Sequence, residues 1–102
     1  MPDQSLSKAF VAKITAAPGS ESELEELLTG AVELANQEAG TVVWFAVRTA
    51  PDTFWIFDAF QSEEDRQAHA NGQIVAALNA NAGLLGAEPE IMPADVLASK
   101  MP

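Results

Sequence analysis

Two neighbouring segments of this sequence are apolar on both of their alternating faces, and this pattern constrains the fold most. They are residues 42–49, VVWFAVRT, and residues 54–60, FWIFDAF, and their only charged residues are Arg48 and Asp58. Successive residues of a β-strand point to opposite sides, so each segment is predicted to be a strand with two apolar faces. The short turn at residues 50–53, APDT, joins the two strands in a hairpin.

A strand and an amphipathic helix are predicted before this hairpin. Residues 8–15, KAFVAKIT, alternate with a period of two, which is typical of a strand. After Pro18-Gly19, the pair Ser20 and Glu23 has the spacing of a capping box. Leucines and alanines at helical spacing then predict an apolar stripe, and Gly40 is expected to close the helix.

A second helical region and a last strand follow the hairpin. Ser62 is predicted to cap the helix, and Asn71-Gly72 to interrupt it. Residues 90–97 are predicted to form an edge strand, because Pro93 cannot donate a hydrogen bond to a neighbour. The order β-α-β-β-α-β predicts a ferredoxin-like α+β fold with an antiparallel sheet. We expect one domain over residues 1–102, with its core at about 8–97.

Composition excludes several classes of function. The chain of 102 residues has no Cys, and its net charge of −10 disfavours nucleic acid and membrane surfaces as partners. No apolar run suits a signal peptide or a membrane span, so a cytoplasmic protein is expected. With one His and no Cys, a zinc site is not expected, and no cluster of acids predicts Mg²⁺ or Ca²⁺. No phosphate-binding loop or dinucleotide fingerprint is present.

The two-sided hairpin also predicts a homodimer. In a ferredoxin-like domain the helices cover one face of the sheet, and the other face would expose apolar side chains. A second copy of the same sheet is the simplest cover. The alternative is that residues 84–102 fold back over this face.

His69, the single histidine, is the main candidate for acid–base chemistry. Asp65 precedes it by four residues, which places both on one side of a helix, where the carboxylate could orient the imidazole. The competing interpretation is a solvated pair on an acidic helix. Arg48 and Asp58 are the other polar residues expected beside a cavity between sheet and helices.

Nearly the whole chain resembles the antibiotic biosynthesis monooxygenase family, whose quinol-monooxygenase-like members are dimeric α+β barrel proteins. The resemblance lies in residues 13–28, 38–69 and 74–78. Its pattern includes an E-x-G entry into the second strand, an acid and an aromatic at the end of the third, and a Ser-capped helix bearing His. The matching residues are Glu38, Gly40, Asp58, Phe60, Ser62 and His69.

The resemblance implies a monooxygenase that needs no metal or flavin cofactor and oxidises a quinol- or anthrone-like aromatic with O₂. It implies His69 or Asp58 as the catalytic proton acceptor. The residues expected to bind the substrate are Trp44, Trp55, Phe57 and Arg48. The alternatives are a non-catalytic dimeric module that binds a small hydrophobic metabolite and a purely structural dimer.

Three departures from the family pattern bear on this activity. Asp58 stands where Glu is usual, and no second His follows His69. The first strand also lacks the Asn that the haem-degrading relatives use, so haem degradation is not expected.

Overall fold

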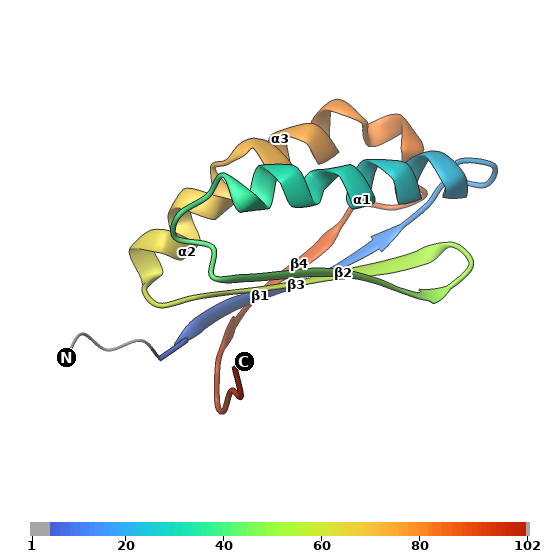
Figure 1. Cartoon of the computed structure of the whole chain (residues 1–102). Helices are drawn as coiled ribbons and strands as arrows, with labels where there is room; N and C mark the ends of the chain where they lie inside the picture. The colour runs from blue at the N-terminus through green and yellow to red at the C-terminus, as the bar shows by residue number, and fades with distance from the viewer. Residues whose placement is uncertain (1–4, 102) are drawn as a thin grey trace.

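Four antiparallel strands form one open sheet in the computed structural model, which describes residues 5–101 (Figure 1). Residues 1–4, part of the N-terminal segment considered above for a signal peptide, and Pro102 lie outside this range. The strand order is β2-β3-β1-β4, so β4 is an edge strand, as its proline predicted. The strands are β1 (Lys8–Thr15), β2 (Val43–Ala50), β3 (Thr53–Phe60) and β4 (Glu90–Asp95).

The helices cover one face of this sheet (Figure 1). They are α1 (Glu21–Asn36), α2 (Glu63–Ala70) and α3 (Gln73–Ala80), followed by a 3₁₀ turn at Ala82–Leu84. The second helical region is broken between α2 and α3, at the predicted Asn71-Gly72 interruption. The ferredoxin-like β-α-β-β-α-β fold is thereby confirmed. No helix within residues 5–101 is long and apolar enough to cross a bilayer.

The core lies between α1, α3 and the helix-facing side chains of the strands. Leu24 and Leu28 of α1 pack against Phe54 and Ile56 of β3, and all four side chains are buried. The strand residues share a face because their positions differ by two. This apolar layer holds α1 over β2 and β3, and it leaves the space beside α2 for the polar groups described below.

The beginning and end of α1 differ from the sequence prediction. The Ser20 side chain makes no capping hydrogen bond. Its backbone N–H already donates to Ala17 in a turn, and its φ of −105° and ψ of 9° are not the extended values of a capping residue. The helix ends at Asn36, four residues before Gly40. By contrast, Ser62 caps α2 as predicted, with its hydroxyl accepting from the Asp65 N–H at 3.1 Å.

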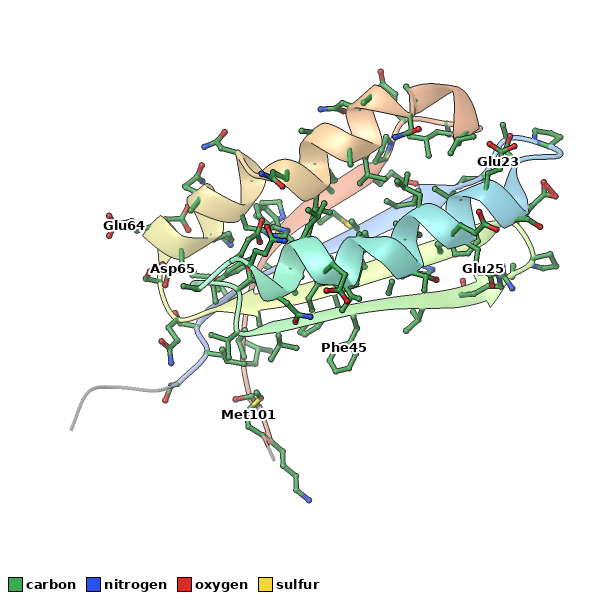
Figure 2. The ribbon with its side chains drawn as sticks, turned by 45° about the horizontal axis from the view of Figure 1, so that its top comes forward. Glu23, Glu25, Phe45, Glu64, Asp65 and Met101 are labelled. Atoms are coloured by element: carbon green, nitrogen blue, oxygen red, sulfur yellow. The ribbon has the colours of Figure 1, made fainter. Side chains whose placement is uncertain are left out.

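The other face of the sheet carries exposed apolar side chains. Phe45 is 58% exposed and Phe57 is 41% exposed, and they are register partners on β2 and β3. Figure 2 shows Phe45 pointing away from the helices, with Met101 on the same side of the sheet. Residues 98–101 and these strands line a hollow of about 500 Å³. The C-terminal segment therefore reaches this face but leaves much of it open.

Candidate functional site

Two carboxylate side chains and one imidazole meet between the helices and the sheet. Glu38 comes from the turn after α1, Asp58 from β3 and His69 from α2. His69 Nδ1 lies 2.6 Å from Glu38 Oε1, and His69 Nε2 lies 3.0 Å from Asp58 Oδ2. Both ring nitrogens are thus engaged by acids. His69 and Asp58 are only 5% and 2% exposed, so the pair is shielded from water.

Local packing fixes the position of the imidazole. The Ser62 cap starts α2 so that His69 is on its buried side. The ring centroids of Phe60 and Phe10 lie 5.3 Å and 6.3 Å from that of His69. The Thr41 hydroxyl fixes the Glu38 carboxylate by donating a hydrogen bond to Oε1 at 2.7 Å.

Two glycines let the Glu38 turn approach the helices closely. A Cβ on Gly40 would lie 2.6 Å from the Asp65 carboxylate, and a Cβ on Gly72 would lie 2.7 Å from Glu38 Oε2. Real Cβ atoms essentially never lie within 3.0 Å of such a neighbouring atom. The E-x-G sequence therefore serves close approach at this site, and it does not end α1.

The two acids set the protonation of His69. Burial lowers the pKa of the imidazole. The hydrogen bonds to Asp58 and Glu38 and the negative charges of these acids raise the pKa, and together they outweigh the effect of burial. The net result is a pKa raised above the ordinary value of 6.5. Near neutral pH the ring therefore shifts toward the imidazolium, which donates to both carboxylates.

A cavity of about 100 Å³ lies against this cluster, between the sheet and α2 and α3. Asp58, His69 and Trp44 supply its polar groups. Its remaining lining is apolar: Phe10, Ala12, Ile56, Ala70, Ile74, Val75, Leu78 and Ile91. Within residues 5–101, Asp58 Oδ1 and the Trp44 indole N–H are buried without a hydrogen-bond partner. Two residues that line the cavity thus each hold a buried polar atom without a partner, an acceptor on Asp58 and a donor on Trp44.

The structure brings three of the predicted site residues together and separates the other three. Asp58, His69 and Trp44 line the cavity. Arg48 instead pairs with Glu25 at 2.8 Å, farther along β2. Trp55 and Phe57 lie on the opposite face of the sheet, because they alternate with Ile56 and Asp58 along β3. Trp55 and Phe57 therefore do not line this cavity, and their role in substrate binding stays a prediction.

Glu38 is the main residue that reasoning about chemistry missed. Helical spacing offered Asp65 as a carboxylate that could orient His69, whereas the two ring nitrogens contact Glu38 and Asp58. Glu38 is 31 residues from His69, so helical spacing could not link them. Its place in the E-x-G pattern was the signal available. Among residues 5–101, no group of three or more His, Cys, Asp or Glu side chains is arranged so that it could hold a metal ion.

Comparison with known proteins matches this architecture. A solved structure of a protein of unknown function from Nitrosomonas europaea is similar over 95% of each chain, with 48% identity and a TM-score of 0.93. A Pseudomonas aeruginosa protein is 24% identical, with a TM-score of 0.80 over 94% of this chain and 99% of its own.

A proposed antibiotic biosynthesis monooxygenase from N. europaea shares the fold at 14% identity, with a TM-score of 0.79 over 95% of this chain and 96% of its own. No curated protein matches the sequence. The model of the antibiotic biosynthesis monooxygenase family matches residues 9–81 of the 102. With most of its length covered by that model and the fold in agreement, the chain belongs to the antibiotic biosynthesis monooxygenase family.

Proposed function

We propose that this protein is a cofactor-independent monooxygenase that oxidises an electron-rich hydroxyaromatic, such as a quinol or an anthrone, with O₂. The observation that supports it most is Asp58 in the wall of a largely apolar cavity, with its Oδ2 against His69 and its buried Oδ1 without a partner. A proton acceptor in a dry, shaped site is what such a reaction requires of the protein.

Asp58 is the group that accepts the proton directly. Both ring nitrogens of His69 are already hydrogen-bonded, so the imidazole has no free position for a ligand. Asp58 uses Oδ2 for His69 and leaves Oδ1 without a partner, and the residue lines the cavity. His69 is then a positioning residue, and it also holds the transferred proton as an imidazolium between two carboxylates.

The reaction starts when the substrate hydroxyl donates to Asp58 Oδ1 while His69 is neutral. Proton transfer raises the electron density of the ring, which then reacts at carbon with O₂. One oxygen atom stays on that carbon and the other leaves as water. A quinol and O₂ thus give a hydroxyquinone and water, with no further reductant.

Oxygen uptake by the metal-stripped, flavin-free protein tests this proposal. Hydroquinone, reduced menadione and anthrone should each be tried against a protein-free control. We expect uptake above autoxidation with at least one, and Asp58→Asn should lower it by about 10²–10⁴-fold. His69→Ala should also lower it, whereas Asp95→Asn on the exposed edge of β4 should leave it unchanged.

Uptake no faster than autoxidation with all three compounds would contradict the monooxygenase proposal and favour a non-catalytic binding module. Uptake that survives Asp58→Asn in a variant with the wild-type melting temperature would remove Asp58 from the mechanism.

We also propose that the protein works as a homodimer whose copies meet through the helix-free face of the sheet. Phe45, Val47 and Phe57 are exposed together on β2 and β3. Isolated monomers seldom leave such a patch in water. A two-fold axis would place each patch against its own copy.

A further inference from the structure

The volume of the cavity limits the ligand that it can enclose. It measures about 100 Å³, and an apolar cavity of about 150 Å³ is known to hold one benzene ring. One ring can enter only if part of it stays in the cavity mouth. Ile91 of β4 is 44% exposed, which marks the side where the lining meets solvent. Two or three fused rings would extend well beyond the lining.

The two unpartnered polar atoms limit the chemistry of the ligand. Asp58 Oδ1 accepts hydrogen bonds, and the indole N–H of Trp44 donates one. Trp44 and Asp58 are direct partners in the β2–β3 register, so their side chains lie next to each other on the helix-covered face. A hydroxyl group both donates and accepts, and so it matches this pair.

The rest of the lining favours a flat apolar body. Phe10 and Trp44 provide aromatic surface, and Ile56, Ile74 and Leu78 provide aliphatic contacts. None of these five side chains carries a charge. A second polar group inside the cavity would therefore lose hydration without a new partner, so the second hydroxyl of a hydroquinone has to lie in the cavity mouth.

We propose that this cavity selects a single hydroxylated aromatic ring over fused polycycles, with the hydroxyl donating to Asp58 Oδ1 and accepting from Trp44 Nε1. The inference deepens the proposed function and rests on it for the reacting end of the ligand. It narrows the substrate class from quinols and anthrones in general to one-ring phenols and hydroquinones.

Calorimetric titration without oxygen separates this binding step from turnover. Phenol, 2-naphthol and 2-anthrol carry one hydroxyl on one, two and three rings, and toluene replaces the hydroxyl of phenol by a methyl group. We expect phenol to bind at least tenfold more tightly than the fused-ring compounds. This order is the reverse of what apolar area alone would give. Toluene should bind about a hundredfold more weakly than phenol, because it makes neither hydrogen bond and each is expected to contribute about tenfold.

Two tryptophan variants provide the matched comparison. Trp44→Phe keeps an aromatic ring but removes the N–H, and it should weaken the binding of phenol about tenfold relative to that of toluene. The enlarged cavity affects both ligands, so the ratio of their affinities isolates the hydrogen bond. Trp55→Phe, on the other face of the sheet, should change neither the affinity for phenol nor the affinity for toluene. If Trp44→Phe does not fold, the four ligands on the wild-type protein still decide the question.

The outcomes distinguish this inference from the monooxygenase proposal. Equal or tighter binding of 2-naphthol or 2-anthrol would overturn the selection for one ring, even if anthrone consumed oxygen. Equal binding of phenol and toluene would overturn the paired hydrogen bonds. Phenol selectivity as expected, with oxygen uptake no faster than autoxidation on hydroquinone, reduced menadione and anthrone, would uphold the inference and overturn only the proposed catalysis.

Discussion

His69 has a carboxylate oxygen against each of its two ring nitrogens. A neutral imidazole carries one N–H, so it can donate to only one of these acids. The protonated ring donates to both, and the hydrogen bonds to Asp58 and Glu38 outweigh the cost of burial. The site thus stabilises its charged form, although the ring is almost fully removed from water.

The raised pKa predicts how His69 contributes to stability. Because the folded-state pKa is above the unfolded value of 6.5, the contribution is fully present below pH 6.5 and falls as pH rises through the folded-state pKa. His69→Gln should lower the free energy of unfolding by roughly 2 kcal/mol at pH 6 and by less at pH 9. Urea unfolding of both proteins across this range measures the difference.

No other histidine complicates the comparison, because His69 is the only one in the chain. If the free energies of unfolding of wild type and His69→Gln differ by a constant or growing amount from pH 6 to pH 9, the raised pKa of His69 is contradicted.

Turnover should depend on pH in the opposite direction. The proposed proton transfer needs a neutral His69, so kcat/KM should rise with pH through the raised pKa of this group and then level off. A pH profile of oxygen uptake, corrected for autoxidation at each pH, measures it. A rate that falls over that interval would exclude the His69–Asp58 pair as the base.

At the scale of the elements, two glycines with different surroundings give opposite predictions. A Cβ on Gly30, in the middle of α1, would meet nothing within 4 Å. Gly30→Ala should therefore stabilise the protein by up to about 1 kcal/mol, because alanine favours the helix.

Gly40→Ala should instead destabilise it by about 1–3 kcal/mol, because the new methyl group would overlap the Asp65 side chain. Thermal unfolding of both variants measures the contrast. Equal effects of the two substitutions would show that the Glu38 turn does not pack closely against α2.

The elements themselves were largely predictable from sequence. Residues 8–15 formed a strand with the expected bounds, and 42–49 differed by one residue at each end, because period-two alternation is a local property. Ser62 was predictable as a cap for the same reason. Ser20 was not, since its backbone belongs to a turn that residue types alone do not specify.

At the scale of the whole molecule, the open face of the sheet predicts self-association. We expect wild type to be a dimer by light scattering during gel filtration. Phe45→Glu should weaken it by about 100-fold or more, because two-fold symmetry places the charge in the interface twice. Val32→Glu is the matched control, since Val32 is also exposed and apolar but lies on α1. A wild-type monomer, or a dimer that tolerates Phe45→Glu, would contradict this interface.

The candidate site was only partly predictable, because it depends on the whole fold. The sequence indicated His69 and Asp58 as residues capable of acid–base chemistry. The period of the strand placed Trp44 and Phe45 on opposite faces of the sheet. The meeting of Glu38 with His69 is a tertiary contact across 31 residues. No local sequence pattern links residues so far apart, so the contact of Glu38 with His69 could be found only from the packing of α2 on the sheet.

The two tryptophans on opposite faces of the sheet make the chain its own pair of optical probes. The sequence contains no tyrosine, so Trp44 and Trp55 dominate the near-ultraviolet emission. Trp44 lines the cavity, and Trp55 lies on the helix-free face. An emission change that persists in Trp55→Phe therefore reports occupancy of the cavity. One that persists in Trp44→Phe reports association of two chains, so both events can be followed in a single cuvette without a label.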